Sequence, residues 1–247
     1  METVSAKRFR HASIQLIGVF AILAGSILTA HTSSAAARDC SVKADEQRNL
    51  KPPISTLSLE TVRIRLNGVE YAVPANYFRY PPVGFNTEGD MLLRTTYPDL
   101  QGATRETQKW FDQGLNPHTL QILVTRQKNS ANLKGFLMGV EQRFPPPKNM
   151  RTVSQEFGLT RIKFTADRGY YIRAVDAFYR TKGEQVVDFF RCNRGRNGDL
   201  STCRMIVLLD HAQVQITFMP EHIPQWQQVK QAGVTLLERF RFRAKDN

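Results

Sequence analysis

The amino-acid sequence predicts an α+β fold of antiparallel sheets, arranged in one domain or in two lobes, with a helix packed on each sheet. Residues 61–73 alternate apolar and polar side chains on both sides of Asn67-Gly68, a pattern typical of a β-hairpin. After residue 148, short apolar runs follow one another with short turns, as in an antiparallel meander. Near the C-terminus, apolar residues recur at helical spacing.

The first lobe is expected over residues 59–144. Val62, Ile64 and Leu66 should share one face of the first strand. Pro74 ends the second strand, because proline has no N–H to donate to a neighbouring strand. Further along, the pattern predicts strands at 91–97 and 119–125, a short helix at 104–113 and a helix at 132–144.

The triple proline at 145–147 ends that helix and is the predicted boundary between the lobes. The second lobe, residues 148–243, is expected to contain the meander and a final helix. Its predicted strands are 157–165, 169–175, 177–181, 185–192, 203–209 and 212–219. The final helix begins near Pro224 and packs on the sheet through one apolar face, which consists of Trp226, Val229, Gly233, Leu236, Leu237 and Phe240.

Residues 1–37 have the order of a secretory signal peptide. A basic start at 7–10 is followed by an apolar, uncharged run at 14–30 and by small residues at 33–37. The mature protein is therefore expected in the periplasm or outside the cell, and it begins with a polar, flexible leader at 38–58. The alternative is that residues 14–30 stay in place as an inner-membrane anchor, since their length is near the lower limit for a spanning helix.

Cys192 and Cys203 are predicted to form a disulfide, because an exported compartment favours such bonds. They flank a polar loop at 193–202, and the apolar runs on either side would bring them together as antiparallel strands. A bridge of this loop length stabilises a fold by about 3 kcal/mol. Cys40 is left over, and it is free, pairs between chains, or competes for one of the other two.

The sequence contains no motif that indicates catalysis. There is no Gly-x-Ser-x-Gly and no glycine-rich phosphate loop followed by a helix. His118, His211 and His222 are isolated from one another, and the acidic residues at 88–99 are typical of solvated turns. We therefore expect a protein that is not an enzyme and that holds no metal or cofactor.

Two stretches are better suited to binding. The first contains Tyr77, Phe78, Arg79, Tyr80 and Phe85, and aromatic residues with arginine are enriched in interface cores. The alternative for this stretch is that its rings pack over one end of a sheet.

The second stretch is the bridged loop, which carries Arg194 and Arg196 and is flanked by Arg191 and Arg204. A loop tethered by a disulfide loses less entropy when it binds a partner. The alternative is a loop that is only solvated.

The charge balance has two interpretations, an acidic partner or a basic surface that serves solubility alone. The chain has 34 Lys and Arg against 22 Asp and Glu, a formal net charge of +12. A basic exported protein meets acidic proteins, anionic lipids or acidic glycans, whereas the export signal excludes nucleic acid. The expected partner is another protein, and the alternative is an anionic lipid or glycan of the cell envelope.

Three segments resemble a group of small exported proteobacterial proteins encoded beside type VI secretion effectors. These are Tyr71-Ala72-Val73-Pro74-Ala75-Asn76-Tyr77, Tyr97-Pro98-Asp99-Leu100, and the run from Cys203 to Phe240. Some members of this group are immunity proteins, which bind and block a toxin that enters the periplasm. The resemblance implies a periplasmic protein-binding module of the immunity type and implies no catalytic residues.

Overall fold

The computed structural model describes residues 57–80, 86–127, 131–143, 151–164, 175–195 and 197–242. All of them belong to one compact unit, Asn49–Asn247. The predicted signal peptide, the leader up to residue 56, Cys40, Phe85 and Arg196 lie outside the described residues. Within the described ranges, no helix is long and apolar enough to cross a membrane.

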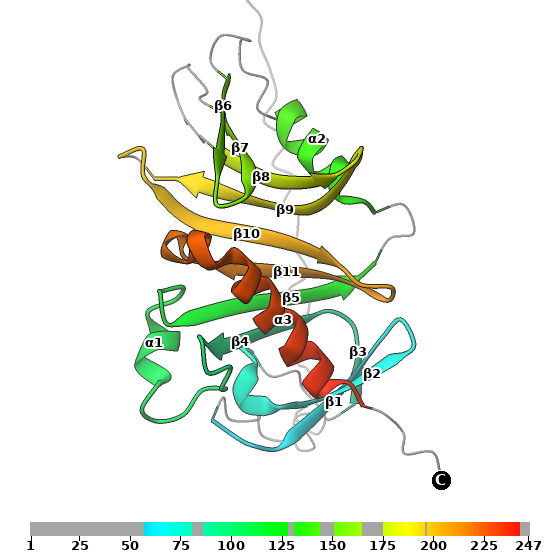
Figure 1. Ribbon diagram of the computed structural model, residues 1–247. Coiled ribbons are helices and arrows are strands. Elements are labelled where there is room, and N and C mark those ends of the chain that lie inside the picture. The colour runs from blue at the N-terminus through cyan, green and yellow to red at the C-terminus, as the bar shows by residue number, and fades with distance from the viewer. Residues whose placement is uncertain are drawn as a thin grey trace, which may run out of the picture. The chain divides into compact units, whose positions relative to one another are not determined.

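A large antiparallel sheet lies at the centre of this unit (Figure 1). Its strands are β4 (Met91–Thr96), β5 (Thr119–Arg126), β6 (Arg151–Glu156), β7 (Leu159–Phe164), β8 (Val175–Lys182), β9 (Gln185–Arg194), β10 (Leu200–Leu208) and β11 (Ala212–Phe218). Their order across the sheet is β4-β5-β11-β10-β9-β8-β7-β6, and every neighbouring pair is antiparallel. The predicted α+β class with antiparallel sheets is confirmed.

The triple proline at 145–147 does not separate two sheets. β5 precedes it and β11 follows it, yet the two strands pair directly, with Ile122 opposite Ile216. Both strands bury alternate side chains, and side by side they present these side chains to one helix. The predicted division into lobes 59–144 and 148–243 is therefore corrected to one unit built on one large sheet.

The opening hairpin is confirmed. β1 (Thr61–Leu66) pairs with β2 (Val69–Pro74), and the small sheet is completed by β3 (Asn86–Glu88), which runs parallel to β1. The two turn residues Asn67 and Gly68 have φ of 50° and 79°, as a two-residue turn of type I′ requires.

A second hairpin, between β6 and β7, was not expected from the sequence. Its turn is Phe157-Gly158, with φ of 55° and 75°, and a phenylalanine is a rare choice for left-handed backbone. β6 itself gives no apolar pattern because it is an exposed edge strand. The strand predicted at 169–175 lies outside the described residues except for Val175, where β8 begins.

The helices are α1 (Gln108–Asp112), α2 (Leu133–Arg143) and α3 (Trp226–Phe240). Asn132 caps α2, since its Oδ1 accepts a hydrogen bond of 2.7 Å from the Gly135 N–H. Pro224 lies in a 3₁₀ turn, Pro220–Gln225, that leads into α3.

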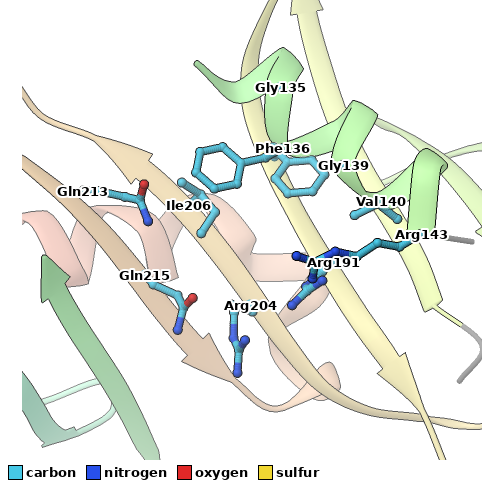
Figure 2. Close-up of a pocket in the computed structure, with 11 residues that line it drawn as sticks. Gly135, Phe136, Gly139, Val140, Arg143, Arg191, Arg204, Ile206, Gln213 and Gln215 are labelled. Atoms are coloured by element: carbon cyan, nitrogen blue, oxygen red, sulfur yellow. The ribbon is translucent and has the colours of Figure 1, made fainter. Parts of the chain in front are cut away.

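α2 and α3 lie on opposite faces of the large sheet. Successive strand residues alternate between the faces, so Phe190 belongs to the α3 cluster and Phe189 to the α2 cluster. α2 packs on β8 and β9 through Val140 and Phe136 (Figure 2). The buried members of this smaller cluster are Val140, Ile162, Phe164, Val175, Ala177, Phe189 and Ile206.

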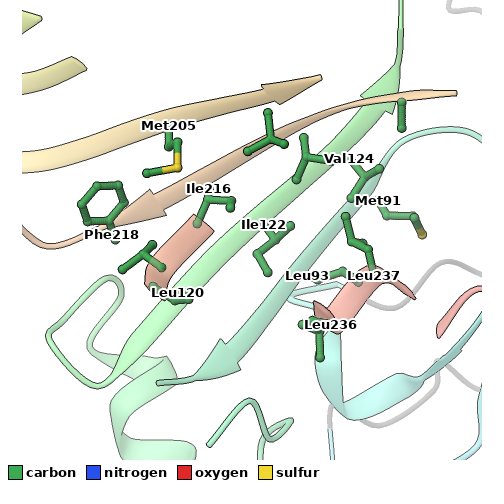
Figure 3. Close-up of a cluster of buried hydrophobic side chains, with 14 of the residues drawn as sticks. Met91, Leu93, Leu120, Ile122, Val124, Met205, Ile216, Phe218, Leu236 and Leu237 are labelled. Atoms are coloured by element: carbon green, nitrogen blue, oxygen red, sulfur yellow. The ribbon is translucent and has the colours of Figure 1, made fainter. Parts of the chain in front are cut away.

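The main core lies between α3 and the other face (Figure 3). The six apolar residues predicted for the α3 face are its buried residues, so this prediction is confirmed. Leu236 and Leu237 lie over strand residues that include Ile122 and Leu93 (Figure 3). Gly233 allows close approach, since a Cβ at this position would clash with the Ile216 side chain and lie 3.0 Å from its Cγ1.

The predicted disulfide is present. Cys192 on β9 lies directly opposite Cys203 on β10, with Cα atoms 4.0 Å apart and sulfur atoms bonded. Both cysteines are fully buried in the main core. The bond therefore joins two central strands below the loop at 193–202.

Candidate functional site

The aromatic stretch predicted for binding is split between core and surface. Tyr77 and Phe78 are buried, and the Tyr77 hydroxyl donates a 3.0 Å hydrogen bond to the Leu100 carbonyl. Both residues belong to the main core, so their side chains are not available to a binding surface. Arg79 and Tyr80 are exposed, Tyr80 by 74%, and their binding role stays a prediction.

The positive charge of Arg194, at the start of the bridged loop, is neutralised by a buried carboxylate. Arg194 makes a bidentate ion pair with the fully buried Asp176, at 2.7 Å from Nε to Oδ1 and 2.8 Å from Nη2 to Oδ2. Its Nη1 also donates to the Gly198 carbonyl, and Arg161 pairs with the same carboxylate. Arg194 is therefore corrected from a free binding cation to a residue that anchors the loop to β8.

A pocket of about 320 Å³ lies between α2 and the α2-side face of the sheet (Figure 2). A second, wider hollow of about 570 Å³ shares Gly135, Phe136 and Gln213 with it and extends to Asp90 and Arg126. We call the two hollows together the α2 groove. The residues that line the first pocket are Gly135, Phe136, Gly139, Val140, Arg143, Phe189, Arg191, Arg204, Ile206, Gln213 and Gln215.

The groove is apolar on one side and cationic at one end. Phe136, Phe189 and Ile206 form its apolar part, and the Phe136 and Phe189 rings stack with centroids 6.4 Å apart. Gln213 and Gln215 extend from β11 with amide groups (Figure 2). An apolar wall with a few polar groups is typical of a recognition site.

Arg143, Arg191 and Arg204 form an arginine cluster at the cationic end. Arg191 and Arg204 are directly opposite each other on β9 and β10, and Arg143 reaches from α2 toward Arg191 (Figure 2). Within the described part of the chain, no hydrogen-bond or ion-pair partner is found for any of the three guanidinium groups. Among the described residues, the cluster is therefore a group of positive charges with no ion-pair partner.

Electrostatics supports this description. The pKa of Arg191 is lowered, mainly by its partial burial and further by the positive charges of Arg204 and Arg143. Like charges directly opposite each other on neighbouring strands are destabilising. A carboxylate or another oxyanion in the cluster would relieve this repulsion through charge-assisted, bidentate hydrogen bonds.

Two glycines of α2 open the groove. A Cβ at Gly139 would meet no atom within 4 Å, and one at Gly135 would meet only the Asn132 side chain, at 3.4 Å. Glycine in a helix costs about 1 kcal/mol relative to alanine. The packing of the described residues therefore does not require glycine at either position. The space that a side chain would occupy there is part of the groove.

The three histidines within the described ranges each have a structural contact. His118 stacks on Trp110 with ring centroids 4.8 Å apart, and His222 Nε2 lies 2.7 Å from the Pro117 carbonyl oxygen. His211 Nε2 lies 2.5 Å from the Tyr71 hydroxyl. Burial lowers the pKa of His211 and raises that of Tyr71 to about 12.

Among the described residues, no three His, Cys, Asp or Glu side chains come close enough together to hold a metal ion.

The sequence contained a signal for part of the arginine cluster. Arg191 precedes Cys192 and Arg204 follows Cys203, so once the cysteines pair across two strands, both arginines project to the opposite face and oppose each other. No local pattern indicates that α2, distant in sequence, covers this face beside them.

Comparison with known proteins supports the fold. No protein-family model and no curated protein matches the chain. A solved structure with a similar fold is that of Smlt3025, an immunity protein of the Stenotrophomonas maltophilia type IV secretion system. The match has a TM-score of 0.54 and 13% identity, and it covers 78% of this chain and 100% of that one. The fold is thus like that of an immunity protein, while the association with a type VI system stays a prediction.

Proposed function

We propose that this chain is an immunity-type protein that binds another protein, a secreted toxin, and blocks it by occlusion. The observation that carries the proposal is the arginine cluster, which lies unpaired among the described residues beside an apolar wall. Interface cores combine aromatic residues with arginine in this way. The likeness in fold to an immunity protein adds support.

We propose further that the mature chain acts outside the cytoplasm after removal of residues 1–37. The basic, apolar and small-residue order of that segment supports this location. The Cys192–Cys203 bond adds support, because disulfides persist in oxidising compartments. The activity needs no catalysis, since occlusion is achieved by binding alone.

A second candidate function is binding of an anionic lipid or glycan of the envelope. The observation that favours it is the formal net charge of +12. Binding of this kind is spread over the surface and is weakened steeply by salt, because exposed charges are screened over about 8–10 Å at physiological ionic strength. A packed protein interface is less sensitive to salt.

The test is a pull-down with the oxidised mature chain, residues 38–247, from envelope extract at low and at high salt, read by mass spectrometry. The proposal predicts one stoichiometric protein that survives high salt and whose toxicity to cells the chain suppresses on co-expression. Diffuse recovery of lipid or glycan that is lost at high salt would support the second function instead. Recovery of no stable protein partner would contradict the proposal.

A further inference from the structure

The arginine cluster sets the charge of what enters the α2 groove. Three guanidinium groups meet there, and Arg191 is in part removed from water. Among the described residues that line the groove, the acidic side chain is Asp90, and it lines the second hollow rather than the pocket that holds the three arginines. Glu141 on α2 pairs with Arg151. An anionic group supplied from outside is therefore the matching ligand.

The rest of the groove sets the kind of molecule. An inorganic anion would leave the apolar wall at Phe136 and Ile206 uncovered. The groove also continues past Phe136 to Arg126, well beyond the cluster. An extended segment with apolar side chains beside its charge would cover the whole site, whereas a lipid headgroup or a single anion would fill only one end.

The glycines set how closely that segment approaches. Gly135 and Gly139 are four residues apart, so they lie on one face of α2, which is the face that lines the groove. Without a Cβ at these positions, a second backbone can come into contact with the helix. The intrinsic cost of two glycines in α2 is then offset when a partner is bound.

From these three features we infer that the α2 groove receives a segment of the partner protein that carries an Asp or Glu side chain flanked by apolar residues. Its carboxylate binds Arg191 and Arg204, with Arg143 closing from α2, and its backbone passes along Gly135 and Gly139. This inference rests on the proposed function and names the partner chemistry of the same site.

The test uses the oxidised mature chain and a random-peptide phage library. Peptides are selected on the wild-type protein alone, and their dependence on Arg191 and Arg204 is measured afterwards with the Arg191→Gln, Arg204→Gln double variant. Selected peptides are then measured by fluorescence anisotropy at physiological salt. Arg105→Gln serves as a matched control, because Arg105 is exposed and does not line the groove.

The expected peptides contain an acidic residue beside apolar ones. Replacing that residue by its amide should weaken binding about tenfold or more, and so should the double arginine variant, since a hydrogen bond to a charged group contributes about 1.5–3 kcal/mol. Gly139→Leu should have a comparable effect because its side chain fills the groove. Arg105→Gln should change the affinity by less than about twofold, as expected for an exposed charge.

Three results would overturn the inference. These are selected peptides that bind equally well as amides, peptides that bind the double variant as tightly as the wild type, and a selection that yields no groove-dependent peptide. Vesicles containing phosphatidylglycerol test the lipid alternative. If the wild type binds these vesicles, the double variant does not bind them and no peptide is selected, the groove is a lipid site. Circular dichroism confirms that each variant is folded.

The proposed function and the inference about the groove can be contradicted independently of each other. If the pull-down yields a toxin whose affinity is unchanged in the double variant, the proposed function holds and the inference about the groove is wrong. If groove-dependent acidic peptides are selected but the pull-down yields no protein partner, the chemistry of the groove holds and the proposed function is wrong.

Discussion

The substitution Gly139→Ala separates folding from binding. A Cβ at Gly139 would meet no atom within 4 Å, and the backbone there is not left-handed. The only effect expected on the free protein is therefore the gain in helix propensity from glycine to alanine, about 1 kcal/mol. For a protein of this size, that gain corresponds to an increase in Tm of about 2–4 °C.

The same substitution in α3 has the opposite expectation and serves as the control. A Cβ at Gly233 would clash with Ile216 in the main core. Overpacking of this kind costs about 1–3 kcal/mol, which equals or exceeds the propensity gain of about 1 kcal/mol. Gly233→Ala should therefore be neutral at best and is expected to lower the free energy of unfolding.

The assay is urea unfolding of the oxidised mature chain, followed by far-ultraviolet circular dichroism. We expect a higher midpoint for Gly139→Ala, a lower one for Gly233→Ala, and unchanged m-values. The more stable variant should bind the partner more weakly, because its new methyl group occupies the groove. A destabilised Gly139→Ala protein would refute the reasoning, since it would show that the groove is filled by the chain itself.

Three further predictions concern stability. Asp176→Asn leaves two arginines facing a neutral side chain in a buried site, and urea unfolding should show a loss of about 3–5 kcal/mol; a loss below about 1 kcal/mol would show that the ion pairs are not formed in solution. The Cys192→Ser, Cys203→Ser double variant should lose about 3 kcal/mol in the same assay, and unchanged stability would argue against the bridge. Burial lowers the pKa of His211 below its usual 6.5, so the unfolded chain binds a proton at this residue more readily than the folded chain. The contribution of His211 to the free energy of unfolding is therefore fully present above about pH 6.5 and is lost as the pH falls below it. Tm measured from about pH 8 to about pH 5 should therefore fall less steeply for His211→Gln than for the wild type, and parallel curves would contradict this.

Local patterns predicted local structure well. The alternation around Asn67-Gly68 and the apolar face from Trp226 to Phe240 each reflect one periodicity, and both are confirmed. The disulfide followed from two cysteines at the base of one loop. In each case the residues that decide the outcome lie close together in the sequence.

Long-range arrangement was less predictable. The pairing of β5 with β11 joins segments on either side of the triple proline, and neither strand contains information about the identity of its neighbour. The β6–β7 turn was not predicted because its first residue, Phe157, has a φ of 55°, and phenylalanine rarely adopts left-handed backbone. The helix boundary at 132–144 was predicted closely, but not the face of the sheet that α2 covers.

The candidate site shows the same limit. Aromatic residues are enriched both in interface cores and in protein cores, so composition could not place Tyr77 and Phe78, which are buried. Charge could not show that Arg194 has an internal partner in Asp176. Arg191 and Arg204 were noted only as flanks of the loop, because their role depends on the sheet face that they share with α2.

The measurement that tests the account most directly is calorimetric titration of the protein partner recovered in the pull-down against the mature chain. The wild type is compared with the Arg191→Gln, Arg204→Gln double variant and with Arg105→Gln. The account predicts that the double variant binds at least about tenfold more weakly, while Arg105→Gln binds like the wild type. Equal affinities for all three proteins would contradict the claim that the arginine cluster contacts the partner.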